Sequence, residues 1–377
     1  MTGAVLVAGT AVGVLAWSRQ LTRGLLETGL TSVVPWGLYT VLFTLFVSAS
    51  AGALGLTCAG VLLPRGALTD LVRPASGVAV AGAAAALLTV VVNLAHPERV
   101  ANLVLHPNWS APSVWQLYGV LATLVLSVVP AALRGRWATP PVGLRVLSIA
   151  GLLLALGLPV LTAWVFSFPL GQPTWNDSLL TPTLLASTAT VGVALVAVAA
   201  LAFTPRGQVR VAVAVRDRLA TMLLGALGVT LLLTALGYVA ALSRMPKERA
   251  VVELVLPGGA WAWLFWTQWL AGALAVALLV VPRLRAVRAA LGVAMTAATV
   301  AVLALYAALI PAGEMTPPVS LPPGTATGRW APDVSSFVQT GAYAPSWTEY
   351  GVGVGLLTVF VAVLLLAYGR DRRGVRG

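Results

Sequence analysis

Two histidines are the side chains in this sequence best suited to proton transfer near neutral pH. His96 and His106 lie ten residues apart, and an imidazole changes charge close to physiological pH. A neutral imidazole can take a proton from a hydroxyl group or hydrogen-bond a carbonyl oxygen. We therefore predict that His96 is a proton relay, held neutral by burial near a membrane surface. His106 is the second candidate, with a structural role in its loop as the alternative.

Four more residues could contact a ligand bound beside His96. Asn93 precedes His96 by about one helical turn, so helical spacing places the two on one face. Trp36 and Tyr39 share a face of another predicted helix, and Arg99 follows His96 closely. Tyr39 could donate to a carbonyl oxygen. The alternatives are an interfacial anchor for the aromatic pair, an interhelical hydrogen bond for Asn93 and a surface ion pair for Arg99.

Redox and metal chemistry inside the chain is disfavoured by residue type. The single cysteine, Cys58, cannot hold an iron–sulfur cluster, which needs about four thiolates. Two histidines near one loop cannot bracket a haem between helices, and no His, Cys, Asp or Glu group has metal-ligand spacing. The sequence therefore predicts no haem, no iron–sulfur cluster and no metal in this chain.

The elements that must position these residues are membrane helices. Of 377 residues, 59% are hydrophobic and only 9% are charged, whereas a soluble domain carries about 25% charged residues. About 20 apolar residues are enough to cross a bilayer as a helix. We predict an all-α, polytopic integral membrane protein of about ten transmembrane helices. The predicted helices cover 3–17, 35–63, 74–95, 113–133, 143–168, 180–204, 219–243, 258–282, 287–311 and 351–368.

The distribution of basic residues predicts the orientation. Sixteen arginines fall in the loops after the second, fourth, sixth and eighth helices and in the C-terminal tail, against seven basic residues in the opposite loops. Cytoplasmic loops are the richer ones in Lys and Arg, so both termini are predicted to be cytoplasmic and 312–350 to be an extracytoplasmic loop. The same rule explains the net charge of +12, and we predict no nucleic-acid partner.

Acidic and aromatic residues refine this interpretation. None of the eleven carboxylates falls within a predicted span. Proton pumps generally place acidic or histidine relays at membrane depth, so we expect protons to exchange only with the outer side.

Twelve of the thirteen tryptophans fall at the predicted outer ends of helices, all except Trp137. This one-sided distribution predicts a docking surface or a ligand site near the outer face.

Three blocks of sequence resemble the NrfD-type membrane subunits, in particular those like the HybB and DsrP proteins. The first block is Gly24-Leu25-Leu26-Glu27-Thr28-Gly29-Leu30 followed by Pro35-Trp36-Gly37-Leu38-Tyr39. The second runs from Asn93-Leu94-Ala95-His96-Pro97-Glu98-Arg99 through Leu105-His106-Pro107-Asn108 to Ser113-Val114-Trp115. The third joins Thr162-Ala163-Trp164-Val165-Phe166, Gly171-Gln172-Pro173-Thr174-Trp175-Asn176 and Leu179-Leu180-Thr181-Pro182.

The resemblance covers roughly 18–205 and implies both a fold and a function. The implied fold is two helix bundles, with a quinone headgroup near the outer face of the first. The chain departs from the family pattern at four positions. Asn93 stands for an aspartate, His96 and Gln172 stand for arginines, and Pro159 stands for a histidine.

Taken together, these features predict a quinone-interacting membrane anchor subunit of a respiratory oxidoreductase in a prokaryotic plasma membrane. It would exchange electrons between quinone or menaquinone and an extracytoplasmic, ferredoxin-like iron–sulfur subunit, with a separate catalytic subunit. The quinone-site candidates are Trp36, Tyr39, Asn93, His96, Arg99 and His106. Two alternatives stay open, namely a membrane transport permease and a structural anchor whose quinone site has decayed.

Overall fold

The computed structural model describes most of the chain. The described residues are 2–31, 34–63, 68–94, 96–133, 140–168, 175, 177–203, 209–243, 246–314 and 343–369. Gln172 and most of the predicted extracytoplasmic loop at 312–350 lie outside these ranges. Within them every regular element is a helix, and no strand occurs.

The long helices alternate with short helical turns. They are α1 (Thr2–Arg23), η1 (Gly24–Glu27), α2 (Leu38–Leu62), η2 (Thr69–Leu71), α3 (Val72–Asn93), η3 (Pro97–Arg99), α4 (Val100–Leu105), α5 (Pro112–Leu133), α6 (Val142–Ser167), α7 (Leu180–Phe203), α8 (Val209–Leu242), α9 (Pro246–Val255), α10 (Ala262–Val280), α11 (Pro282–Ala286), α12 (Arg288–Glu314) and α13 (Trp347–Gly369).

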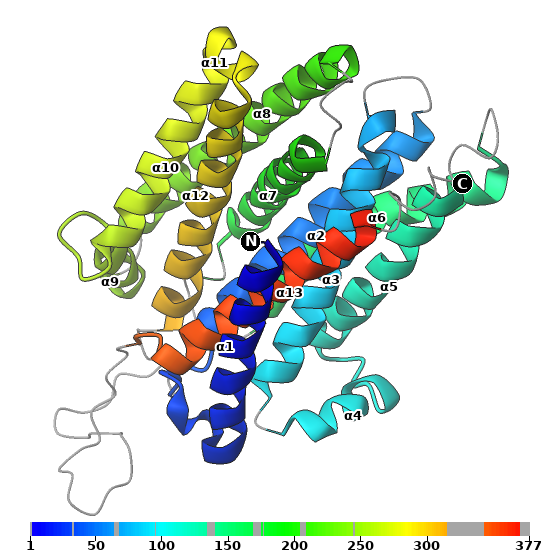
Figure 1. The fold of residues 1–377 in the computed structure, drawn as a ribbon. Coiled ribbons are helices and arrows are strands. Elements are labelled where there is room, and N and C mark those ends of the chain that lie inside the picture. Colours follow the sequence, from blue (N-terminus) through cyan, green and yellow to red (C-terminus); the bar gives the residue numbers. More distant parts are fainter. Residues whose placement is uncertain are drawn as a thin grey trace, which may run out of the picture.

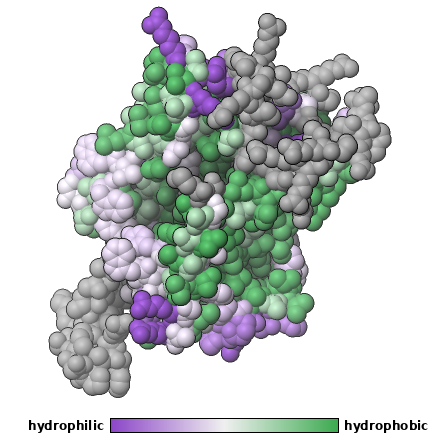
Figure 2. All heavy atoms as spheres, in the orientation of Figure 1, coloured by the Kyte–Doolittle hydropathy of each residue, from purple (hydrophilic) through white to green (hydrophobic). Residues whose placement is uncertain are grey.

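Ten of the described helices are long and apolar enough to cross a membrane, which confirms the predicted all-α, multi-pass class. A helix satisfies its backbone hydrogen bonds internally, and this is what allows apolar segments to cross a bilayer. Figure 2 shows hydrophobic residues over the middle of one face and hydrophilic residues near both ends. The molecule has one end that carries α4 and α9, here called the α4 end, and an opposite end that carries α11 (Figure 1).

The helices form two packed groups and a peripheral pair. In the first group α2 contacts α3, α5 and α6, and in the second α7 and α10 contact α8 and α12. α1 lies along α13 at the side of the first group (Figure 1). The two groups meet where α2 crosses α7, and a Cβ added at Gly192 would lie 2.5 Å from the Gly52 Cα. Glycine at these positions therefore allows the two backbones to touch.

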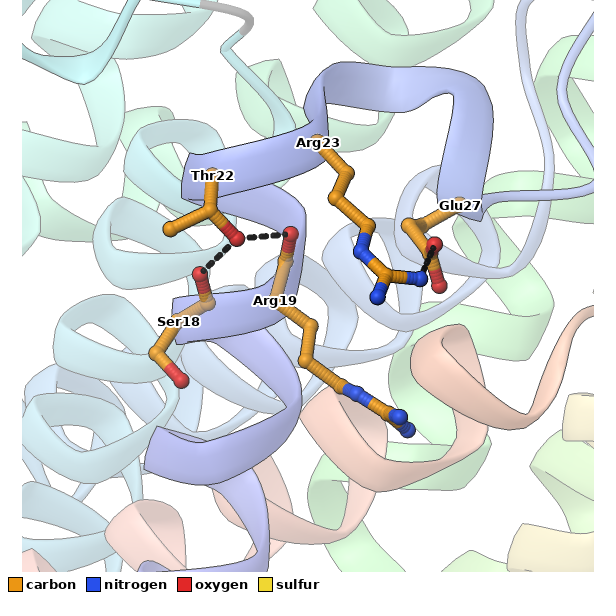
Figure 3. A network of polar contacts seen from close by, with 5 residues as sticks. All are labelled: Ser18, Arg19, Thr22, Arg23 and Glu27. Atoms are coloured by element: carbon orange, nitrogen blue, oxygen red, sulfur yellow. Dashed lines mark hydrogen bonds and ion pairs between the residues drawn. The ribbon is translucent and has the colours of Figure 1, made fainter.

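The end of α1 lies beyond the predicted span of 3–17. The helix continues to Arg23 because its last residues are polar but still helix-forming. The Thr22 hydroxyl donates to the carbonyl oxygens of Ser18 and Arg19 at 3.1 and 3.0 Å. Arg23 then forms an ion pair with Glu27 at 2.9 Å, across the turn that ends the helix (Figure 3). Hydropathy detects only the apolar part of such a helix.

One sequence expectation about carboxylates is wrong. α13 begins at Trp347 rather than at 351, so Glu349 lies in its first turn and inside a candidate membrane span. α12 likewise extends to Glu314, which is its last residue. Both side chains are buried, with exposed fractions of 0% for Glu349 and 3% for Glu314. Two carboxylates are thus buried at the end of the bundle where the sequence placed only loop residues.

Candidate functional site

The α4 end of the first helix group gathers buried polar groups around the segment that joins η1 to α2. This segment runs from Thr28 to Gly37, of which 32 and 33 lie outside the described residues. Side chains from α1, α12, α13 and the segment before α13 hydrogen-bond to it or to its neighbours. These bonds determine how the start of α2 is positioned.

Glu349 is the first anchor of this segment. Its Oε2 accepts the backbone N–H groups of Gly29 at 2.7 Å and Ser346 at 2.9 Å. Its Oε1 accepts the Tyr343 hydroxyl at 2.6 Å, and that hydroxyl oxygen in turn accepts the N–H of Leu38 at 2.7 Å. Burial and the nearby Glu349 raise the pKa of Tyr343 above its usual range. One carboxylate therefore joins α13 both to the loop and to the first turn of α2.

Glu314 is the second anchor of this segment, and its carboxyl group has fewer hydrogen-bond partners than that of Glu349. Its Oε2 accepts the backbone N–H of Trp36 at 2.9 Å, and no other hydrogen bond to its carboxyl group is seen in the described part of the chain. Burial raises the pKa of Glu314 to about 8, because an apolar setting disfavours the charged form. This group can therefore hold or release a proton near neutral pH.

Three aromatic rings pack together near the last turn of α12, which contains Glu314. Trp36 stacks on Trp175 with ring centroids 5.0 Å apart, and Phe166 meets Trp36 edge-on at 5.5 Å. Trp175 is 1% exposed, and its Nε1 donates to the Leu309 carbonyl oxygen at 3.1 Å. A Cβ at Gly313 would lie 2.3 Å from that Nε1 atom. The rings thus pack against the last turn of α12, and Trp36 takes part in this packing rather than standing at the surface.

Two further hydrogen bonds link α1, α2 and α3. The Tyr39 hydroxyl donates to Gln20 Oε1 at 2.7 Å, and Gln20 Nε2 donates to the Val92 carbonyl oxygen at 2.7 Å. Tyr39 is 1% exposed and Gln20 is 3% exposed. Asn93 follows Val92 directly and is half-buried at the end of α3. Tyr39 and Asn93 are therefore brought to the same region, with Gln20 between them.

The remaining predicted site residues lie on the surface at this end. His96 Nδ1 is 2.9 Å from Glu98 Oε1, and the two side chains are 61% and 65% exposed. A hydrogen bond from its own backbone N–H holds the pKa of Glu98 below its usual range, and His96 lowers it further. Arg99 and His106 are also exposed. The expectation of a buried His96 is wrong, because α3 ends at Asn93 and the chain turns outward into η3.

The six predicted site residues thus divide into three groups. Gln20 links Tyr39 to Val92, the residue before Asn93, by hydrogen bonds, and these two predicted residues form the first group. Trp36 belongs to the aromatic cluster. His96, Arg99 and His106 are exposed. Sequence reasoning did not select four buried polar residues of this end, which are Gln20, Glu314, Tyr343 and Glu349. Glu349 carried a local signal, because Ser346 and Glu349 form a capping box before an apolar run, with the Glu349 N–H donating to Ser346 Oγ at 3.2 Å.

The exposed surface of the α4 end is aromatic. Trp109 and Trp115 are 51% and 45% exposed, and their rings lie 5.2 Å apart. Trp115 Nε1 donates to the Trp109 carbonyl oxygen at 2.8 Å, and the Tyr118 hydroxyl donates to the Val104 carbonyl oxygen at 2.8 Å. These bonds hold the turn after α4 against α5. No group of three metal-ligating side chains occurs within the described ranges.

Comparison with known proteins agrees with the sequence motifs. The family described as "Polysulphide reductase, NrfD" matches residues 26–318. A protein of Halobacterium salinarum, described as a putative membrane subunit of dimethyl sulfoxide reductase, is 27% identical over 390 aligned residues. That alignment covers 94% of this chain and 87% of the relative. The similarity therefore extends over all but a small part of both proteins.

Proposed function

Because the chain belongs to the polysulphide reductase NrfD family, we propose that it is the quinone-interacting membrane subunit of a respiratory oxidoreductase. It exchanges electrons between membrane quinone or menaquinone and a peripheral iron–sulfur subunit, which passes them to or from a catalytic subunit. The relative described as a membrane subunit of a reductase supports an assembly of several subunits. The sequence blocks further support a place in the HybB- and DsrP-like branch.

The observation that carries the proposal is a pair of buried hydrogen bonds. They run from Tyr39 to Gln20 and from Gln20 to the carbonyl oxygen of Val92, which precedes Asn93. The Tyr39 hydroxyl already donates to Gln20 Oε1, so the groups suited to hydrogen-bonding the carbonyl oxygens of a quinone headgroup are the side-chain amides of Gln20 and Asn93. Reducing a quinone consumes two electrons and two protons, and oxidising the quinol releases them. The exposed pair of His96 and Glu98 supports a proton route between this region and water.

The same proposal includes an orientation and a docking face. Both termini lie in the cytoplasm, and the α4 end faces the outside of a prokaryotic plasma membrane. The iron–sulfur partner lies over the loops at 96–112 and 168–179, of which 169–174 and 176 lie outside the described residues. The exposed rings of Trp109 and Trp115 support this face, because aromatic residues are enriched at protein–protein contacts.

Purification from the native membrane tests the proposal. We expect an iron–sulfur subunit and a catalytic subunit to copurify with this chain, and the complex to oxidise or reduce quinone analogues. Asn93→Leu should raise the KM for the analogue, with a smaller change in turnover at saturation, because the amide contacts the headgroup in both redox states.

Three outcomes would contradict the proposal in different ways. An intact complex that neither binds nor turns over quinone analogues would identify a structural anchor with a decayed site. A monodisperse single chain that moves a solute across proteoliposomes would identify a permease. A single chain that is fully active with quinone by itself would remove the need for an iron–sulfur partner.

A further inference from the structure

The second helix group carries an apolar groove that the quinone proposal does not use. It lies between α10 and α12 and has a volume of about 550 Å³. A Cβ added at Gly292, which lines the groove, would meet no atom within 4 Å. The lining is made of small or apolar residues and includes Ala271 of α10 and, along α12, Ala289, Gly292, Val293, Thr296 and Val300. All of these α12 residues except Gly292 are exposed, so the groove is open to the surroundings of the protein.

The groove extends over about half the thickness of a membrane. Its α12 residues run from Ala289, in the first turn of the helix, to Val300, which at about 1.5 Å per residue is about 16 Å. The hydrocarbon core of a bilayer is about 30 Å thick, so one leaflet accounts for about 15 Å. A transmembrane helix of a partner needs a surface along the whole core, whereas a lipid acyl chain needs one leaflet. The length of the groove therefore favours an acyl chain.

The groove begins beside a group of arginines. Ala289 follows Arg288 directly, and α11 connects α10 to α12 at this end (Figure 1). α11 also contacts α8. The described arginines of α8, α11 and the start of α12 are Arg216, Arg218, Arg283, Arg285 and Arg288. Asp217 Oδ1 lies 3.7 Å from Arg216 Nε, and these arginines form no other ion pair within the described ranges. This end therefore combines an excess of positive charge with an apolar groove.

Hydrogen bonds position three of the guanidinium groups at helix ends. Arg216 Nη1 donates to the Ala286 carbonyl oxygen at 3.1 Å. Arg285 Nε donates to a carbonyl oxygen in the last turn of α10, and Arg288 Nη2 donates to one near the end of α7. Carbonyl groups are neutral, so these bonds orient the guanidinium groups without cancelling their charge. Each guanidinium group has five N–H donors, more than these bonds use, in a planar fork that fits phosphate oxygens.

A basic side is expected in any multi-pass membrane protein, but that rule does not require a groove beside the arginines. We propose that the α11 end binds an anionic phospholipid, with its phosphate among Arg283, Arg285 and Arg288 and one acyl chain in the groove between α10 and α12. Basic residues at the membrane end of a helix bundle are suited to such headgroups. The site lies at the opposite end of the molecule from Tyr39 and Asn93. It therefore stands whether or not the electron-transfer proposal holds.

The test measures the lipid retained by the full chain, purified from its native membrane with the subunits that stay bound. The sample is exchanged through detergent and incubated with equal amounts of phosphatidylglycerol and phosphatidylcholine that have the same acyl chains. Retained lipids are then quantified per chain by mass spectrometry. Wild type should retain at least about tenfold more of the anionic lipid, equivalent to about 1.4 kcal/mol. Glycerol phosphate at the same concentration should not displace it, because it has no acyl chain.

Two variants separate the two parts of the site. Gly292→Leu places a side chain in the open space of the groove and should lower the retained phosphatidylglycerol by at least about tenfold, equivalent to about 1.4 kcal/mol. Arg283→Gln combined with Arg285→Gln removes two charges, while the glutamine amides can still donate hydrogen bonds. This double variant should lose the preference for phosphatidylglycerol over phosphatidylcholine.

Matched controls make the same changes elsewhere. Gly225→Leu alters an exposed glycine of α8 that does not line the groove. Arg19→Gln combined with Arg23→Gln removes two exposed charges of α1 at the α4 end. Both controls should retain lipid as wild type does.

Three outcomes would overturn the proposal, namely equal retention of the two lipids by wild type, equal losses in the controls, or displacement by glycerol phosphate. If Gly292→Leu fails to assemble, wild type alone decides. Phosphatidylglycerol with a photoactivatable acyl chain must then label peptides of α10 or α12, and labelling only elsewhere overturns the site.

Discussion

At the scale of single residues, His96 and Glu314 are the two groups of the α4 end with the clearest proton chemistry. His96 is exposed and paired with Glu98, whereas Glu314 is buried and accepts the backbone N–H of Trp36. An exposed imidazole exchanges protons with water quickly, and a buried carboxyl group with a raised pKa holds one near neutral pH. The two residues therefore call for different tests.

His96→Ala should slow quinone turnover per assembled complex by at least about tenfold, equivalent to about 1.4 kcal/mol of barrier. The reason is that His96 lies directly beyond Asn93 and can pass protons to water through Glu98. The assay is quinone-analogue oxidation or reduction, normalised to intact complex. His106→Ala is measured in parallel, because His106 is the second candidate and is also an exposed histidine of this end. Normal turnover in His96→Ala, or a larger loss in His106→Ala, would refute the assignment.

Glu314→Gln should remove a pH dependence of stability. Burial raises the pKa of Glu314 from 4.5 to about 8, so between these values the folded chain keeps a proton that an unfolded chain has lost. Its contribution to stability is therefore full below pH 4.5 and falls as the pH rises to about 8, by a few kcal/mol in order of magnitude. Melting temperatures of the complex from pH 5 to 9 should fall in wild type and change less in Glu314→Gln.

Glu27→Gln provides the control for that titration. Glu27 is a partly exposed carboxylate paired with Arg23 (Figure 3), and a surface pair of this kind contributes little to stability. The variant should keep the wild-type decline between pH 5 and 8. A Glu314→Gln curve parallel to wild type over that range would show that Glu314 is already ionised at low pH.

At the scale of elements, the bond between α13 and the segment before α2 depends on one carboxylate. Glu349→Ala leaves the Gly29 N–H, the Ser346 N–H and the Tyr343 hydroxyl without their acceptor. The Tyr343 hydroxyl is buried, and an unsatisfied buried donor costs about 1–3 kcal/mol, whereas the two N–H groups are part-buried and add less. We expect a clearly lower melting temperature and faster proteolysis between Thr28 and Gly37. Glu253→Ala breaks only an exposed ion pair with Arg249 and should behave like wild type. Equal stability of the two variants would show that the segment is held by other contacts.

At the scale of the whole molecule, the orientation in the membrane can be tested with single cysteines. The natural Cys58 is buried and can be replaced by alanine. Ser110→Cys lies at the α4 end and Ala286→Cys at the α11 end, and both positions are exposed. A membrane-impermeant maleimide should label Ser110→Cys on intact cells and Ala286→Cys only after permeabilisation, because basic residues favour the cytoplasm. The reverse pattern would invert the proposed orientation.

Much of the architecture was predictable because the bilayer acts on local sequence. A segment of about 20 apolar residues must form a helix to cross hydrocarbon, so spans such as α2 and α3 follow from hydropathy alone. Family motifs around Trp36, Asn93 and Trp175 depend on residue order and were also visible. Helix ends such as the one at Arg23 were not, since polar residues extend a helix without a hydropathy signal.

The polar arrangement at the α4 end was decided by tertiary structure. Gly29 and Glu349 are 320 residues apart, and Trp36 and Glu314 are 278 apart, yet each pair is hydrogen-bonded. Nothing in the local sequence of Glu314 shows that the Trp36 N–H will bond to it or that Trp175 will pack against the neighbouring Gly313. The burial of Glu314, and therefore its raised pKa, exist only once α12 is packed beside α2 and α7. Sequence by itself determined which segments enter the membrane. Helix packing determined which polar groups meet at the α4 end. The reason is that the desolvation of a side chain depends on all of its neighbours in the folded protein.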